Sequence, residues 1–285
     1  MTSSREEPIR YHRDTYYLES VQQLGADARP FAERHGLLLL KPDAIVARGV
    51  EPTLDWLAAN GYRVVAAREM AVDRLRARAL WYHNWHIASP ERRTIADLMV
   101  ELSPSLLLVV TDDRSGPVAP RLTEGKGPTA PKDRRLGELR HLLGGSTYLL
   151  NFVHTSDTAA EVLRELGVYF GARDRLAVVH EALQGLDREA DARRIAANLY
   201  ESAPEQSFDL DVAKSALIEQ LNASNLRPDS QGTEWATALR DAWHQGTPLD
   251  PWPTIVVGAS VLPMRIPPPR PIDHDVDLDE GAQDS

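Results

Sequence analysis

The chain has 285 residues, of which 42% are hydrophobic, with a formal net charge of -10 and no cysteine. The lack of cysteine excludes disulfides, thiolate metal sites and cysteine nucleophiles, and the acidic balance argues against a nucleic-acid partner. No apolar run approaches the length of a membrane span, and the first residues form no apolar signal core. We therefore expect a soluble, cytoplasmic protein without a membrane partner.

The first part of the chain alternates short apolar runs with stretches of helical spacing. Such patterning predicts strands within 36–44, 62–72, 105–111 and 147–153, and helices over 14–25, 49–61, 73–86, 90–102 and 157–170. The order after residue 35 is β-α-β-α-α-β-loop-β-α, without strict βαβ alternation. It favours an α+β fold, namely a ferredoxin-like antiparallel four-stranded sheet with helices packed against it.

Two other regions differ in character from these elements. Residues 112–146 form a long connection rich in Gly, Pro, Arg and Lys, a kind of loop that is often functional. Residues 174–246 have charged helical spacing, and a short apolar segment, PWPTIVVGASVLPM, follows between prolines. We divide the chain into an N-terminal extension (1–35), a central domain (36–170), a helical C-terminal region (171–265) and a disordered proline-rich, acidic tail (266–285).

Several residues of the central domain have side chains suited to chemistry, but each has an ordinary interpretation. Lys41 follows the first strand, where a solvated turn lysine is common. His83 and His86 lie three apart on a helix, so they share a face and could bind a metal, but no third ligand is evident. The others are residues that more often serve structure or solubility: Arg121, Arg140, Asn151, His154 and Glu165.

Taken in order, these residues resemble the nucleoside diphosphate kinase family over about residues 36–170. "KPDA" (41–44) matches the end of the family's first strand, and "NFVHTSD" (151–157) matches its Asn-x-x-His-x-Ser-Asp signature. Glu165 falls at the family's glutamate. Further matches are His86 with Pro90, Arg121 with Gly125, and Gly137 with Arg140.

The resemblance implies phosphoryl transfer from a nucleoside triphosphate, such as ATP, to a nucleoside diphosphate through a phosphohistidine on His154. Glu165 would orient the imidazole, and Asp157 would hold nucleotide-bound Mg²⁺ through water. The family also forms symmetric oligomers, which implies a homo-oligomer. The nucleotide and its phosphates would contact a set of polar side chains: Lys41, His86, Arg121, Thr129, Arg140 and Asn151.

Among the positions at which the sequence departs from the family pattern, two stand out. Thr155 follows the histidine where the family has glycine, and Glu91 stands where the family stacks the base on phenylalanine. Both departures favour an alternative, a nucleotide-binding or regulatory module with a kinase-like fold and poor or altered catalysis. A third hypothesis is an interaction protein, whose C-terminal helices bind a partner while the central domain serves as a scaffold.

Overall fold

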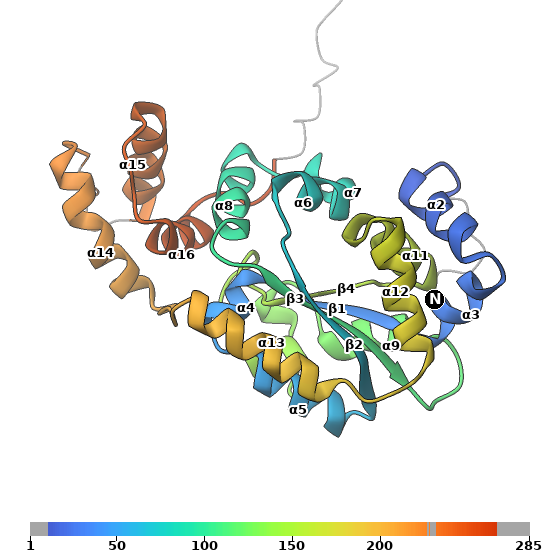
Figure 1. The fold of residues 1–285 in the computed structure, drawn as a ribbon. Coiled ribbons are helices and arrows are strands. Elements are labelled where there is room, and N and C mark those ends of the chain that lie inside the picture. The colour runs from blue at the N-terminus through green and yellow to red at the C-terminus, as the bar shows by residue number, and fades with distance from the viewer. Residues whose placement is uncertain (1–10, 227, 229–231, 267–285) are drawn as a thin grey trace, which may run out of the picture.

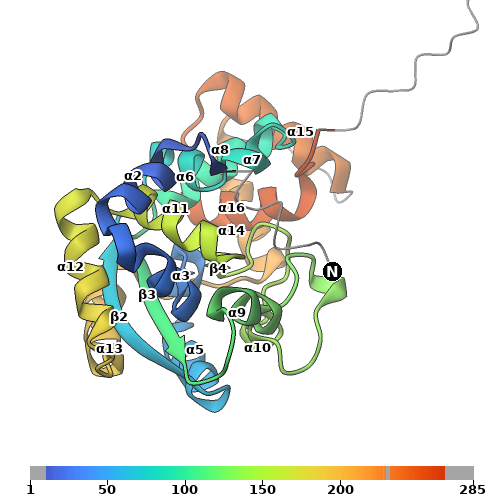
Figure 2. The same ribbon diagram turned by 90° about the vertical axis from the view of Figure 1, so that its right-hand side faces the viewer.

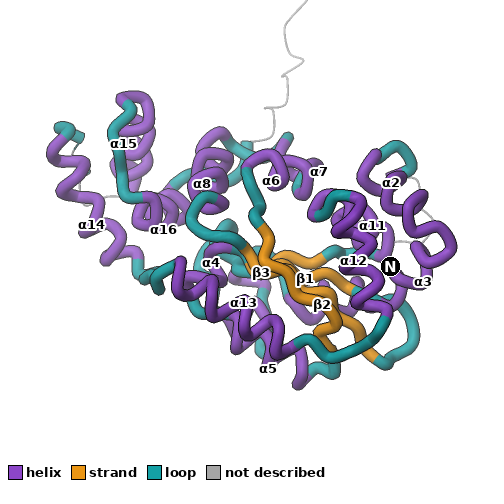
Figure 3. Tube along the Cα trace, viewed as in Figure 1, coloured by secondary structure: helices purple, strands orange, loops and turns teal. Residues whose placement is uncertain are grey.

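The computed structural model describes residues 11–226, 228 and 232–266. Its centre is an antiparallel sheet of four strands in the order β2-β3-β1-β4, surrounded by helices (Figure 3). The strands are β1 (Gly36–Leu40), β2 (Tyr62–Met70), β3 (Ser105–Asp112) and β4 (Val153–Thr155). The predicted α+β, ferredoxin-like fold is confirmed. The predicted disordered tail, apart from residue 266, lies outside the described residues.

Helices precede, separate and follow the strands (Figure 1). In the N-terminal half these are α2 (Thr15–Leu24), η1 (Gly25–Asp27), α3 (Ala28–Arg34), α4 (Pro42–Val46), α5 (Val50–Ala59), α6 (Arg74–Leu80), α7 (Tyr82–Trp85) and α8 (Pro90–Val100). Then follow α9 (Val118–Lys126), η2 (Pro131–Asp133), α10 (Leu139–Leu143), α11 (Ala159–Tyr169), α12 (Ala172–Leu183), α13 (Glu189–Ser202), α14 (Leu210–Ala223), α15 (Gly232–Gln245) and α16 (Pro251–Val261). No helix in the described part of the chain is long and apolar enough to cross a membrane.

The leucine run of β1 is explained by burial on both faces of the sheet. Leu38 and Leu40 belong to one hydrophobic core, whereas Leu37 and Leu39 belong to the other. Successive strand residues point to opposite faces, so a strand covered on both sides needs apolar residues at every position. The first core includes α5, α8 and α13, and the second includes α11 and α12.

The apolar segment between prolines is helix α16, inside the region 171–265 that was predicted to be helical. Two sequence predictions are wrong in detail. The connection 112–146 contains helices α9 and α10. The fourth strand begins only at Val153, so that His154 lies within β4 rather than beyond it. The preceding residues turn instead of extending: Val153 N donates to Asn151 O at 2.7 Å, and Phe152 has a φ of 64°.

The C-terminal helices pack in two places. Helices α12 and α13 lie beside β2, on opposite faces of the sheet, as two views at right angles show (Figures 1 and 2). Farther along the chain, α16 packs against α8, and α14 and α15 pack on α16 (Figure 1). The C-terminal region therefore contacts the central domain both at the outer strand of the sheet and at α8.

Candidate active site

A cavity of about 190 Å³ lies between the end of β1, strand β4 and helix α8. Its lining divides into polar and apolar sets. The polar side chains include Lys41, Asn84, Arg92, Lys126, Thr129, Arg140, Asn151, His154 and Asp157. The apolar and aromatic ones include Trp81, Trp85, Ala96, Met99, Val100, Tyr148, Leu149 and Val153. Six of the nine residues predicted from the sequence thus line one cavity: Lys41, Thr129, Arg140, Asn151, His154 and Asp157.

The imidazole of His154 is held on both of its ring nitrogens. Its Nε2 lies 2.7 Å from Oε1 of Glu165, and Ser156 Oγ donates to Oε2 of that carboxylate at 2.6 Å. Glu165 is only 3% exposed, so it reaches no bulk water. Because a carboxylate accepts hydrogen bonds, Nε2 carries the proton, and the lone pair is left on Nδ1.

Trp81 contacts the other nitrogen. Its indole Nε1 donates to His154 Nδ1 at 3.3 Å, with the two rings nearly perpendicular. An indole can only donate, so this contact supports the same tautomer as Glu165 does. Nδ1 is therefore the ring atom that carries the lone pair, and a group that bonds to it from the cavity would replace the Trp81 contact.

The Lys-Pro-Asp motif joins β1 to the turn before β4. The buried Lys41 ammonium lies 3.3 Å from Asp43 Oδ2 and donates to Leu149 O at 3.1 Å. Asp43 also accepts from Phe152 N at 2.9 Å. Burial lowers the pKa of Lys41, while the Asp43 charge opposes that shift. The motif therefore holds a cation at the cavity and fixes the positive-φ turn at Phe152.

Arg140 is the second buried cation. Its Nη2 donates to Val153 O at 2.7 Å, and its Nη1 donates to Gly127 O at 3.0 Å and to Thr129 Oγ1 at 3.2 Å. Burial lowers its pKa to about 10, so the guanidinium stays charged near neutral pH. Asn151 lies beside it, with Oδ1 at 3.5 Å from Nη2.

A third buried cation, Lys126 at the end of α9, was missed from the sequence. Its Nζ donates to Thr155 Oγ1 at 2.7 Å and lies 3.5 Å from Asp157 Oδ1. Burial lowers the pKa of this ammonium to about 8. Thr123 on α9 also bonds to Thr155, at 2.6 Å. The spacing of Thr123 and Lys126 by three residues places both on one helix face, a signal that the sequence did contain.

Thr155 itself does not narrow the cavity. It is fully buried against α9 through these hydrogen bonds, and the cavity is lined by its neighbour His154 instead. Adjacent residues of a strand point to opposite sides, which explains why a side chain is tolerated here.

Two predicted ligands and the predicted base-site residue lie outside the cavity. Arg121 pairs with Asp112, at 2.7 Å from Nη2 to Oδ1, on the side of α9 away from Lys126. His86 is exposed and lines a separate hollow with His83. Glu91 turns away to the C-terminal region, where Arg240 Nε donates to it at 2.8 Å.

The α6–α8 hairpin faces the cavity with other residues. Trp81, Asn84 and Trp85, spaced as i, i+3 and i+4, line it in place of His86. That spacing is the pattern of one helix face, so the sequence identified the correct hairpin but the wrong face. On α8, Arg92 and Ala96 line the cavity in place of Glu91.

Among the residues that the structure describes, Asp157 is the one carboxylate on the cavity lining. Among the described residues, no three or more His, Asp or Glu side chains gather as a metal site. Mg²⁺ in nucleotide sites is commonly held by one or two carboxylates, waters and the substrate's phosphates. A single half-exposed carboxylate between Thr123 and Lys126 fits that mode of binding.

This geometry agrees with a comparison to known families. A family model described as nucleoside diphosphate kinase matches residues 34–175. Residues 34–175 are a nucleoside diphosphate kinase family domain. The domain extends from just before β1 into α12, and the remaining C-terminal helices lie outside it.

Relatives of the nucleoside diphosphate kinase domain cover about half of the chain. The nucleoside diphosphate kinase of Campylobacter curvus is 28% identical over 138 residues, 48% of this chain and 96% of that protein. That of Oleidesulfovibrio alaskensis is 29% identical over 136 residues, 48% of this chain and 93% of its own length. Among solved structures, the nucleoside diphosphate kinase of Aquifex aeolicus has 20% identity and a TM-score of 0.42, and it covers 48% of this chain and 95% of that one.

Proposed function

We propose that this protein transfers the γ-phosphoryl group of a nucleoside triphosphate to a nucleoside diphosphate through a phosphohistidine at Nδ1 of His154. The Nδ1 lone pair forms the N–P bond, and the bond from the γ-phosphorus to the bridging oxygen breaks. The nucleoside diphosphate leaves with that electron pair. In the second half-reaction, a terminal oxygen of another diphosphate takes the phosphoryl group from Nδ1.

The observation that carries this proposal is the fixed tautomer of His154. Its Nε2 lies 2.7 Å from Glu165, so the proton stays on that nitrogen while Nδ1 acts as the nucleophile. No proton has to move in either half-reaction. The Glu165 carboxylate stabilises the positive charge that develops on the ring as the N–P bond forms.

Three buried cations support the same reaction. Lys41, Lys126 and Arg140 line the cavity with His154, and each is 6% exposed or less. Negative charge spreads over the phosphoryl oxygens during transfer, so cations that are already in place lower the barrier. In this assignment Lys126 supplies the charge that the sequence had attributed to Arg121. Asn151 and Thr129 would contact the sugar and phosphates.

Asp157 would hold Mg²⁺ through water when a nucleotide is bound. The ion, when bound, neutralises charge on the phosphate groups. ATP or another nucleoside triphosphate is the proposed donor, and the cytoplasm, where these nucleotides are abundant, is the proposed compartment. The homo-oligomer implied by the resemblance stays a prediction. Helices α12 and α13 pack beside β2, the outer strand of the sheet.

Labelling with [γ-³²P]ATP tests the proposal. The protein should take up label that is lost in acid and kept in alkali, as a phosphoramidate is. His154→Ala should abolish this label without changing the circular dichroism spectrum. His86→Ala is the matched control, since it removes a histidine that lies outside the cavity, and it should label normally.

The same experiment separates the enzyme from the regulatory alternative. An enzyme passes the label on to any added nucleoside diphosphate, whereas a module without turnover binds nucleotide and retains no phosphohistidine. Acid-labile label that persists in His154→Ala would refute the assignment of the nucleophile.

A further inference from the structure

The C-terminal region lies directly behind one wall of the cavity. This wall consists of α8 together with Tyr148 and Leu149, and several of its side chains line the cavity. Helix α16 packs on α8, and the described residues after α16 continue along the start of α8. The contacts are of three kinds: apolar, backbone and charged.

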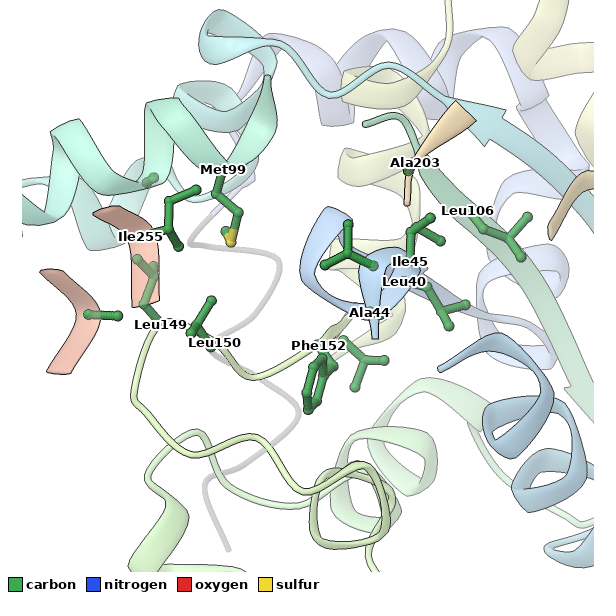
Figure 4. Close-up of a cluster of buried hydrophobic side chains, with 14 of the residues drawn as sticks. Leu40, Ala44, Ile45, Met99, Leu106, Leu149, Leu150, Phe152, Ala203 and Ile255 are labelled. Atoms are coloured by element: carbon green, nitrogen blue, oxygen red, sulfur yellow. The ribbon is translucent and has the colours of Figure 1, made fainter. Parts of the chain in front are cut away.

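The apolar contacts come from α16. Ile255 belongs to the same hydrophobic cluster as Met99 of α8 and Leu149, as the close-up of this cluster shows (Figure 4). A Cβ on Gly258 would collide with the Ile95 side chain, so glycine allows α16 to approach α8 closely. Because the carbonyl of Leu149 also accepts from Lys41 at 3.1 Å, α16 buttresses a residue that positions a cation.

The backbone contacts come from the segment after α16. Ile266 N donates to Ile87 O at 2.9 Å, and Ala88 forms an antiparallel bridge with Arg265. Ser89, the N-cap of α8, donates its hydroxyl to Pro263 O and accepts from Arg92 N. The first turn of α8, which carries Arg92 into the cavity, is thus fastened to the C-terminal segment.

The charged contacts come from two arginines outside the cavity. Arg240 of α15 donates to Glu91 at 2.8 Å, next to Arg92. Arg265 lies 5.3 Å from the centre of the Tyr148 ring and donates to its hydroxyl at 3.2 Å. Arg92 lies 5.1 Å from the same ring. Tyr148 is therefore held both by Arg92 of α8 and by Arg265 of the C-terminal region.

We propose that the C-terminal region is a structural part of the nucleotide site, with Arg240 and Arg265 as positioning residues that set nucleotide affinity. The inference rests on the proposed function for the identity of the ligand. The phosphates occupy the end of the cavity that holds His154 and the cations. The base then meets the other end, where Trp85, Arg92 and Tyr148 supply flat surfaces. Arg240 and Arg265, which hold this end of the cavity in place, therefore affect the affinity for the base and not the rate of phosphoryl transfer.

Three variants of the full chain test this inference. Arg265→Met and Arg240→Met each remove one charged contact and keep an unbranched side chain, and the double variant removes both. Arg194→Met is the matched control, because Arg194 is exposed on α13 in the same region, away from the cavity, and pairs with Asp191 on its own helix. Isothermal titration with ADP and GDP gives Kd, steady-state assays give KM, and rapid quench at saturating ATP gives the rate of His154 phosphorylation.

Each single variant should raise Kd and KM roughly threefold and the double variant about tenfold, since an exposed cation–π contact or ion pair contributes modestly. The rate of phosphorylation at saturating ATP should not change, and Arg265→Lys should restore part of the affinity. Arg194→Met should bind like the unmodified protein.

Unchanged Kd and KM in the double variant would overturn the inference, even if the melting temperature fell. A lower phosphorylation rate with unchanged Kd would also overturn it. Failure of the proposed function is distinguishable: the unmodified protein would then bind nucleotide without forming phosphohistidine, and the Kd comparison would still apply.

Discussion

Lys126 is a buried charge on the cavity lining with few partners. An ammonium that is 6% exposed, with a threonine hydroxyl at 2.7 Å and a carboxylate only at 3.5 Å, is poorly compensated. Burial accordingly lowers its pKa to about 8. A phosphate group would supply the missing negative charge and return the pKa toward its ordinary value.

This pKa gives a pH dependence with a definite sign. Lys126 is charged below about pH 8 and neutral above it, so kcat/KM, which reports the free protein, should fall as the pH rises through 8. In Lys126→Arg the charge persists, and this fall should disappear. Lys126→Met should lower kcat/KM about 100-fold at neutral pH, the usual cost of losing one preorganised charge. The measurement is the pH profile of all three proteins.

Arg121→Met serves as the control for Lys126→Met on the same helix. Arg121 pairs with Asp112 outside the cavity, so its loss should leave kcat/KM nearly unchanged. If kcat/KM instead fell in Arg121→Met and stayed normal in Lys126→Met, Arg121 would be the phosphate-binding residue, as the sequence predicted.

At the scale of elements, the order of strands and helices in the central domain was predictable because apolar spacing records burial. The continuous apolar runs of β1 and β3 and the apolar stretch 64–67 of β2 are such records. The turn before β4 was not predictable in this way. Its residues Leu149, Leu150 and Phe152 are apolar and buried like those of a strand, yet the backbone at Phe152 is held by Asp43, which is distant in sequence.

The positions of site residues were predictable where a motif fixes them and not where a helix presents them. Lys41, Asn151, His154 and Glu165 lie where the motifs indicated. On α9 and the α6–α8 hairpin, a shift of a few residues changes which side chain faces the cavity. The predicted Arg121 and His86 were thus replaced by Lys126 and by Trp81 with Trp85.

Asp43 should be the most sensitive position of the turn before β4. It offers a carboxylate to the Lys41 ammonium and to Phe152 N, and it is fully buried. In Asp43→Ala the buried ammonium loses its partner, so the free energy of unfolding should fall by about 3 kcal/mol. Asp43→Asn keeps an acceptor for Phe152 N and should lose less. Urea denaturation measures both changes.

A small loss in Asp43→Ala, equal to that in Asp43→Asn, would contradict this account. It would mean that the charge of Lys41 finds compensation elsewhere and that the left-handed Phe152 is held by packing alone. Phe152 packs in the hydrophobic core, and packing alone could hold its backbone. The comparison of Asp43→Ala with Asp43→Asn separates this effect from that of the carboxylate.

At the scale of the whole molecule, the C-terminal region covers the outer edge of the sheet. Helix α12 contributes Val178, Val179 and Ala182 to one core, and α13 contributes Ala192, Ala196 and Leu199 to the other. Between these helices, Arg188 N donates to Val64 O of β2 at 2.8 Å. An uncovered edge strand presents unpaired backbone groups to other chains, so this arrangement protects β2 from edge-to-edge association.

Truncation after Phe170 should therefore change the assembly state. It removes both helices and the Arg188 contact, and it exposes the edge of β2 together with the apolar side chains that α12 and α13 cover. We expect self-association or loss of solubility, measured by light scattering and sedimentation. Truncation after Ile266 removes only residues outside the described part of the chain and should change neither property. If the protein cut at Phe170 stays soluble with the same number of subunits per particle, α12 and α13 are not needed to protect β2 from self-association. The helices beyond α11 would then be required only where they support α8 and the nucleotide cavity.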